Sequence, residues 1–251
     1  MTDFEIQPAR LSHSEPNQVE PKDSAPAVVL KSISKLFGRF AALHDLSATL
    51  SAGRIYALLG ENGAGKTTLL RIIAGLSRPS RGTVHVLSSS NVRAVSARIG
   101  YMAHATLLYD ELTARENLDY FRGLYPATEA ARIEELLQIV GLGHVDGRRR
   151  VGQYSQGMRQ RLALARAMLP SPDLLLLDEP FSNVDAGSVA MMSALLGRLR
   201  DRGATLIVVT HQLEALAQVA DEWITLRAGT IVRREAGCGP GPVSALRRGT
   251  P

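Results

Sequence analysis

"GENGAGKTT", residues 60–68, decides the fold class of this chain, because a short apolar run precedes it and a helical pattern follows it. The stretch fits the pattern GxxxxGK(S/T), in which glycines let the backbone wrap phosphate groups with its N–H donors. The start of the following helix adds a favourable field for an anion. A plain glycine turn is the alternative, but the flanking strand and helix patterns favour a phosphate-binding loop. Lys66 would then hold the β- and γ-phosphates, and Thr67 would ligate Mg²⁺ through its hydroxyl.

A second motif, "LLLLDEP" at residues 174–180, places two carboxylates at the end of an apolar run of strand length. An acidic residue at that point lies beside the phosphate loop in sheets of this kind. We expect Asp178 to hold Mg²⁺ through water and Glu179 to activate the attacking water as a general base. A solvated strand end is the alternative for Glu179.

Apolar runs of strand length, among them residues 54–60, 173–180 and 205–211, alternate with helical patterns. Continuous apolar strands with helices between them favour a parallel sheet that is covered on both faces. In the middle of the chain, two apolar stripes at helical spacing predict a helical insertion from Thr113 to about Leu169. The residues of the two stripes are Leu118, Phe121 and Tyr125, then Ile133, Leu136, Leu137 and Val140.

Two helix starts stand out in this insertion. Thr113 and Glu116 fit a capping box. Ser155 is a good N-cap, and Gly157 allows close backbone approach, so this start could bind an anion. An ordinary capped core helix is an equally good interpretation of the second start.

Composition limits the class of protein. The chain has 251 residues, 45% of them hydrophobic, which fits one large or two small domains with a sizeable core. No apolar run approaches the roughly 18 residues that cross a bilayer, and the N-terminus does not resemble a secretory signal. The single cysteine, Cys238, leaves no disulfide within the chain and suits a reducing cytoplasm.

The net charge of +5 raises the question of nucleic acid. The basic residues are scattered, and residues 148–150 form the only dense run in the sequence, so we expect no nucleic-acid partner. Residues 1–27 and 236–251 are polar and rich in proline or glycine. We therefore expect disordered tails around a folded domain at residues 28–235.

The phosphate loop, the helical insertion, the capped helix start and "LLLLDEP" are followed by "VVTH" at residues 208–211. In this order, the chain resembles the ATP-binding subunits of ABC transporters. The resemblance implies a P-loop NTPase of the ABC ATPase type. Its α/β fold would have a mixed or parallel core sheet, an N-terminal antiparallel β portion and a helical subdomain at about residues 105–170. Mg²⁺ would be the cofactor. The residues implied to bind the substrate ATP are Gly60, Glu61, Asn62, Gly63, Ala64, Gly65, Lys66, Thr67 and Thr68.

The same resemblance assigns roles to side chains around the phosphates. His211 would contact the γ-phosphate and orient the water with Glu179, while Lys66 stabilises charge. Phe37 precedes Lys66 by about the interval at which the family places a ring that stacks on adenine. Packing of Phe37 or Phe40 in the core is the alternative.

The family also implies two copies arranged head to tail with two ATP molecules between them. Ser155 and Gly157 would contact the γ-phosphate held by the other copy, and Asp185 would lie at the dimer interface. The implied partners are a second ATP-binding subunit and membrane-spanning transporter subunits. This chain would be peripheral, on the cytoplasmic face of the cell membrane.

The chain departs from the family pattern at two places. The segment Tyr154-Ser-Gln-Gly-Met158 replaces the usual LSGGQ, which leaves the contacts of Gln156 and Met158 open. His104 stands where the family usually has a glutamine whose oxygen reaches Mg²⁺ and the attacking water. Because Mg²⁺ prefers oxygen ligands and imidazole suits softer metals, we expect water at that ligand position with His104 hydrogen-bonded behind it.

The stretch "IGYMAHATLLYDELTARENLDYFRGLY", residues 99–125, resembles one subgroup, the ATP-binding subunits of the haem exporter of cytochrome c maturation. Residues 107–113 would then face a membrane subunit, or serve as a hydrophobic staple for the following helix. The other interpretations are an exporter of drugs, lipids or small molecules, a non-transport ABC ATPase acting on nucleic acid or ribosomes, and a P-loop kinase.

Overall fold

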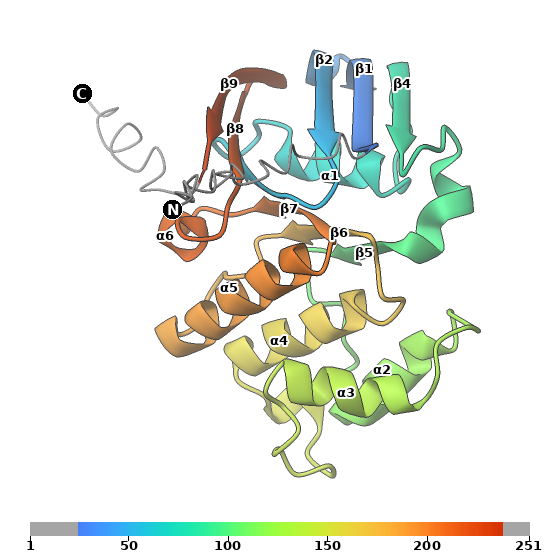
Figure 1. The fold of residues 1–251 in the computed structure, drawn as a ribbon, viewed down its shortest axis with the longest axis vertical. Coiled ribbons are helices and arrows are strands. Elements are labelled where there is room, and N and C mark those ends of the chain that lie inside the picture. The colour runs from blue at the N-terminus through green and yellow to red at the C-terminus, as the bar shows by residue number, and fades with distance from the viewer. Residues whose placement is uncertain (1–24, 238–251) are drawn as a thin grey trace, which may run out of the picture.

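The computed structural model describes residues 25–237, which form an α/β fold with two sheets and a group of helices at one end (Figure 1). The strands are β1 Pro26–Phe37, β2 Phe40–Ser51, β3 Ile55–Leu59, β4 Arg81–Val86, β5 Ile99–Met102, β6 Leu174–Asp178, β7 Thr205–Val209, β8 Glu222–Arg227 and β9 Thr230–Ala236. The helices are α1 Lys66–Ile73, α2 Ala114–Arg122, α3 Ala131–Ile139, α4 Gln156–Ala167, α5 Ala186–Asp201 and α6 Leu213–Leu216, with 3-10 turns at Val92–Arg98 and Val151–Gln153.

The central sheet has the strand order β5-β6-β7-β3-β8-β9. Strands β5 to β8 pair in parallel, and β9 pairs antiparallel with β8. Strands β3, β6 and β7 are buried along their whole length. In β6, Leu175 and Leu177 pack on the helical side, while Leu174 and Leu176 pack towards α1. The predicted sheet, covered on both faces, is confirmed and is mixed because of β9.

A second, antiparallel sheet of β2, β1 and β4 covers α1 from the other side. Helix α1 is amphipathic and buries Leu69, Leu70, Ile72 and Ile73 in the cluster that it shares with both sheets. The predicted antiparallel portion is therefore confirmed. Strand β1 begins at Pro26 and β9 ends at Ala236, so the two outermost strands reach slightly past the expected bounds of 28–235. The rest of the predicted tails, and Cys238, lie outside the described residues.

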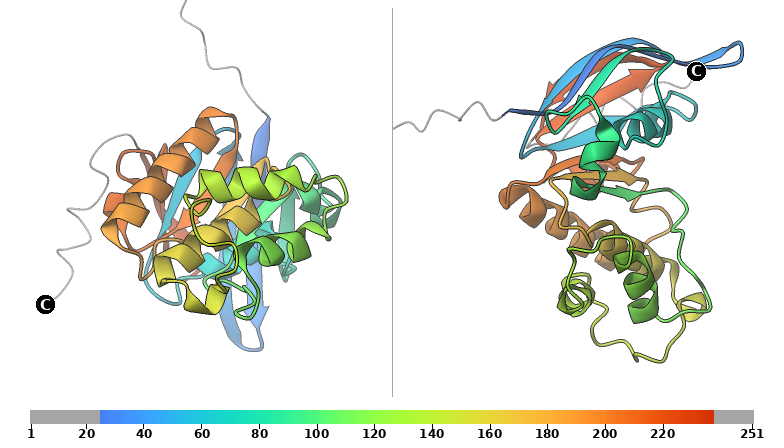
Figure 2. Two further views of the ribbon diagram at one scale, coloured as in Figure 1. Left: turned by 90° about the horizontal axis from the view of Figure 1, so that it is seen from below. Right: turned by 90° about the vertical axis from the view of Figure 1, so that its right-hand side faces the viewer.

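Helices α2, α3 and α4 form the helical subdomain at the end of the molecule opposite the antiparallel sheet (Figure 2). The predicted capping box is present, because Thr113 Oγ1 accepts from Glu116 N and the Glu116 carboxylate accepts from Thr113 N. One prediction was wrong: helix α2 ends at Arg122 with Gly123 as C-cap, so Tyr125 lies beyond the helix. Its side chain still packs on the same apolar cluster.

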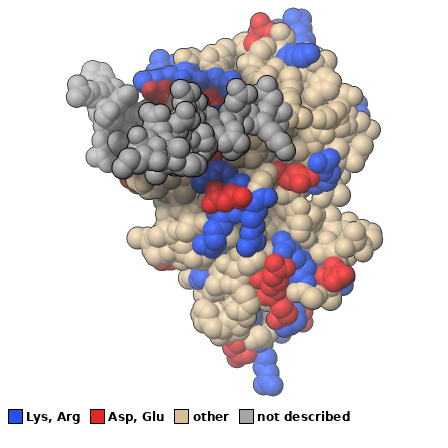
Figure 3. Space-filling model, viewed as in Figure 1, with Lys and Arg blue, Asp and Glu red and all other residues tan. Residues whose placement is uncertain are grey.

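Charged side chains of both signs are interspersed on the face drawn in Figure 3. Within residues 25–237, several opposite charges are paired, such as Arg98 with Asp173 at 2.6 Å and Arg233 with Glu235 at 2.6 Å. Among the described residues, no helix has the length and apolar character needed to cross a bilayer.

Candidate nucleotide-binding site

The phosphate loop connects β3 to α1, and its glycines adopt conformations that other residues avoid. Gly60, Gly63 and Gly65 have φ values of 144°, 82° and 102°. A Cβ at Gly65 would lie 2.5 Å from the carbonyl oxygen of Ala42 on β2. All three motif glycines are therefore required by backbone geometry, and Gly65 is required in addition by close packing against the antiparallel sheet. The loop leads directly into the N-terminus of α1, where free N–H groups favour an anion.

Lys66 is folded over this loop. Its Nζ donates to the carbonyl oxygens of Gly60 at 2.6 Å and Glu61 at 2.9 Å, and the residue is 7% exposed. Burial lowers the pKa of Lys66, and the carboxylates of Glu179 and Asp178 oppose that shift. The ammonium group is thus held inside the loop, where the motif predicts it to meet phosphate.

Thr67 and Asp178 meet although 111 residues separate them in the chain. The Thr67 hydroxyl donates to Asp178 Oδ2 at 2.8 Å, and Asp178 ends the buried strand β6. A hydroxyl and a carboxylate oxygen are the hard donors that suit Mg²⁺. The two predicted metal-binding residues therefore fit that ion.

Glu179 follows β6 in a strained conformation, with φ of 55°. Its side chain is 14% exposed, and one carboxylate oxygen accepts from the backbone N–H of His211 at 3.2 Å. The other, Oε1, has no hydrogen-bond partner within the described chain and lies 3.3 Å from Nε2 of His211. Burial raises the pKa of Glu179 against the opposing effect of His211. A carboxylate with a raised pKa and an oxygen that accepts no hydrogen bond suits a general base.

These side chains line one open cleft of about 570 Å³. Its walls also include side chains from other parts of the chain. The lining residues are Phe37, Phe40, Ala42, Asn62, Gly63, Ala64, Gly65, Lys66, Thr67, Thr68, His104, Asp178, Glu179, Ser182, Val209 and His211. Sequence reasoning missed Ala42, Ser182 and Val209, since small or apolar residues at these places carry no chemical signal.

Phe37 and Phe40 face each other across the turn between β1 and β2. They are 55% and 62% exposed, so the alternative that either ring belongs to the core was wrong. Lys35 Nζ lies 5.0 Å from the centroid of the Phe37 ring. Both rings are thus available to a flat ligand at the mouth of the cleft.

The predicted signature segment lies apart from this cleft. Ser155 caps α4, because its Oγ accepts from Met158 N at 3.3 Å, and Gln156 is exposed beside it. A Cβ on Gly157 would lie 2.9 Å from Asp185 Oδ2. Asp185 caps α5 through a bond from Ser188 N of 2.9 Å, which also lowers its pKa. The structure therefore brings the signature segment and Asp185 together, away from the chain's own phosphate loop.

Residues 43–182 match the ABC transporter family. Over 202 residues, the chain is 39% identical to the ABC transporter ATP-binding protein NatA of Bacillus subtilis, which covers 78% of this chain and 82% of that protein. The chain belongs to the ABC transporter family. The family resemblance expected from the motifs is thereby confirmed.

Other members of the ABC transporter family agree in sequence and structure. The sulfate/thiosulfate import ATP-binding protein CysA of Synechococcus elongatus is 38% identical over 84% of this chain, which spans 63% of that relative's length. The bacitracin transport ATP-binding protein BcrA of Bacillus licheniformis is 34% identical over 80% of this chain and 66% of its own length. A dimeric ATP-binding cassette bound to ADP and Pi in a post-hydrolysis state is 27% identical. It covers 83% of this chain and 98% of its own, with a TM-score of 0.76.

Proposed function

We propose that this chain binds Mg-ATP and hydrolyses it to drive membrane-spanning transporter subunits. The observation that carries this proposal is the arrangement of Glu179, His211 and the Thr67–Asp178 pair around the phosphate loop in one cleft. A P-loop kinase would need a separate acceptor site and would leave the signature segment without a role.

Each part of the cleft has a task in binding. Backbone N–H groups of residues 60–68 and the Lys66 ammonium would hold the phosphates. Adenine would stack on Phe37 or on its neighbour Phe40. Thr67 and Asp178 would hold Mg²⁺, which when bound neutralises charge on the β- and γ-phosphates. His104 lies at the edge of the cleft, and its nitrogen atoms make it a poor direct ligand for that ion.

Hydrolysis would proceed by attack of water on the γ-phosphorus. The bond from that phosphorus to its bridging oxygen breaks, ADP leaves, and the proton of the water passes to Glu179. His211, 3.3 Å from Glu179 Oε1, would orient the water and contact the γ-phosphate. The raised pKa of Glu179 strengthens it as a base.

A second copy would complete the site. The exposed Ser155 start of α4 and the adjacent Asp185 lie outside the lining of the chain's own cleft, which suits a head-to-tail dimer. In that dimer Ser155 and Gly157 contact the γ-phosphate of the other copy. The dimeric ATP-binding cassette similar to this chain supports this arrangement. The dimer would be peripheral on the cytoplasmic face of the cell membrane.

The transporter we propose is the haem exporter of cytochrome c maturation, on the strength of His104 within residues 99–125. A second candidate is another exporter of small molecules, which the similarity to a bacitracin transport protein favours. Both depend on the ATPase activity and on a membrane partner.

The test has two stages. Phosphate release by the purified chain, and its loss in Glu179→Gln, tests ATP hydrolysis. Pull-down from detergent-solubilised membranes then tests transport, since multi-spanning subunits support it whereas ribosomes or DNA contradict it. Deletion of the chain should lower haem-containing cytochrome c; unchanged cytochrome c would reject haem export and leave the small-molecule exporter.

A further inference from the structure

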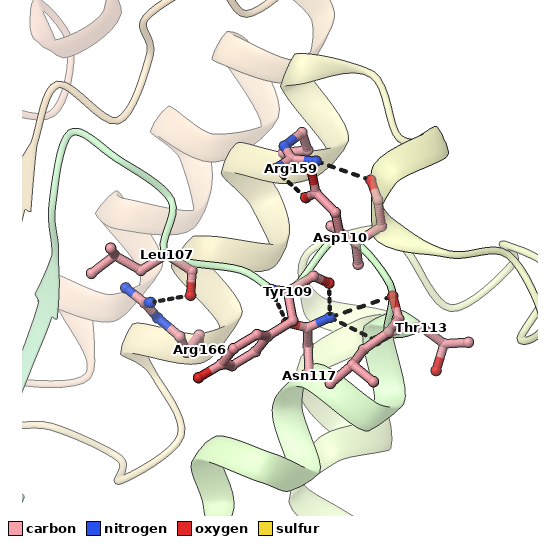
Figure 4. A network of polar contacts seen from close by, with 9 residues as sticks. Leu107, Tyr109, Asp110, Thr113, Asn117, Arg159 and Arg166 are labelled. Carbon is pink, nitrogen blue, oxygen red and sulfur yellow. Dashed lines mark hydrogen bonds and ion pairs between the residues drawn. The ribbon is translucent and has the colours of Figure 1, made fainter.

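The segment of residues 107–113 connects the His104 loop to α2 and is held by a buried amide. Asn117 of α2 is 0% exposed. Its Oδ1 accepts from Tyr109 N at 2.8 Å, while its Nδ2 donates to Tyr109 O at 2.9 Å and Thr113 O at 3.0 Å (Figure 4). One side chain thus pairs with both backbone polar groups of Tyr109. The Tyr109 carbonyl also accepts from Leu112 N at 3.3 Å, so a replacement without an amide would leave the Tyr109 N–H without its acceptor.

Two arginine side chains of α4 bind the same segment. Arg166, 8% exposed, donates to Leu107 O at 3.1 Å, and its guanidinium lies 5.0 Å from the ring centroid of Phe121. Arg159 pairs with Asp110 at 2.6 Å (Figure 4). Side chains of α2 and α4 therefore bind the segment at three residues, Leu107, Tyr109 and Asp110.

Helix α4 and the segment each begin next to a residue of the proposed reaction. Helix α4 begins directly after Ser155, which would meet the partner's nucleotide. The segment begins three residues after His104, which lines the chain's own cleft. Because these contacts join α4 to the segment, a displacement of the Ser155 end of α4 would be transmitted to the His104 loop.

We propose that Asn117 and Arg166 are positioning residues that couple the two nucleotide sites of the dimer through this segment. This inference rests on the proposed function, since it needs a second copy and ATP hydrolysis. Neither residue touches the cleft, so neither contributes to nucleotide binding by a single copy. Their role is in the cooperativity between the two sites.

The experiment compares Asn117→Leu, of similar size without an amide, with the unaltered chain. Affinity for a fluorescent ATP analogue at low protein concentration should stay within about twofold, whereas the Hill coefficient of ATP hydrolysis should fall towards 1. Coupling between sites typically changes affinity by about 5- to 150-fold, so its loss is measurable. Hydrogen exchange at the Tyr109 amide should rise, because that amide loses its acceptor.

Ile133→Val is the matched control, since Ile133 is a buried residue of α3 whose side chain makes none of the hydrogen bonds that hold the segment. It should lower the melting temperature but leave the Hill coefficient and Tyr109 exchange unchanged. Arg166→Lys, which keeps a donor for Leu107 O, should retain more cooperativity than Arg166→Met. If Asn117→Leu does not fold, the Arg166 pair and Asp110→Asn carry the test.

The outcomes separate the two proposals. No ATP hydrolysis by the unaltered chain rejects the proposed function. Hydrolysis that is cooperative in the unaltered chain and equally cooperative in Asn117→Leu or Arg166→Met overturns the coupling role alone. Hydrolysis without cooperativity in the unaltered chain also overturns it, because no coupling then exists for these residues to carry.

Discussion

The nucleotide cleft and the segment of residues 107–113 are held in place in different ways. In the cleft, Asp178 ends β6, Glu179 follows it and His211 follows β7, so backbone pairing of the parallel sheet sets their positions. The segment is held by the side chains of Asn117, Arg159 and Arg166, together with two backbone hydrogen bonds from the turn Val151–Gln153. Sheet-based positions resist single substitutions, whereas side-chain fastenings can be released one at a time. The cleft therefore has the fixed geometry that catalysis needs, whereas the position of the segment is easier to change.

The largest effect is expected in the cleft, from Glu179→Gln. Loss of the general base should lower kcat by about 10²- to 10⁴-fold, while ATP binding persists and the ATP-bound dimer accumulates. Phosphate release and size-exclusion chromatography measure the two effects. Glu129→Gln, an exposed carboxylate outside both regions, should change neither. Substantial hydrolysis by Glu179→Gln would show that another group is the principal base.

Gly65→Ala tests whether the backbone of the phosphate loop is held rigidly by its close contact with β2. The new Cβ would lie 2.5 Å from Ala42 O at a residue with φ of 102°, so nucleotide affinity should fall by about tenfold or more. Calorimetric titration measures it. Gly63→Ala is the control, because φ there is 82° but nothing lies within 4 Å of the new atom. Equal losses in both variants would mean that conformational strain alone, and not the contact with β2, limits the loop.

The pH dependence of kcat/KM also distinguishes the cleft from the segment, because the cleft contains the titrating groups. Burial raises the pKa of Glu179, so on acidification activity should be lost at a higher pH than for an ordinary glutamate. Burial lowers the pKa of Lys66, so the alkaline loss should begin below the ordinary lysine range. Asn117→Leu should leave both limbs in place. A shift of either limb in that variant would contradict the separation of the two regions.

The smallest effect is expected at the end of the segment, where Thr113 caps α2. Thr113→Ala removes the capping oxygen and should lower the free energy of unfolding by about 1 kcal/mol, without changing nucleotide affinity. Urea denaturation measures the change, and Thr113→Ser, which keeps the hydroxyl, is the control. A large loss of ATP binding in Thr113→Ala would mean that the cap supports the cleft directly.

The sequence predicted the cleft better than the segment. Lys66, Thr67, Asp178, Glu179 and His211 lie within or beside short motifs, and the structure brings all five to one place. The same reasoning placed Tyr125 on a helix that ends at Arg122, because apolar spacing does not reveal where a C-cap lies. It did not assign any role to Asn117 or Arg166, since an amide and an arginine on predicted helices look like ordinary surface residues.

By itself the sequence determined the strand–loop–helix unit around residues 60–68, because glycine conformations and apolar runs act over a few residues. It also determined the caps at Thr113 and Ser155, which depend on neighbours three residues away. Tertiary structure alone decided that Gly157 lies against Asp185 and that Arg166 reaches Leu107. Those contacts join residues that are far apart in the chain, so they depend on how α4 packs against other elements and not on a local pattern.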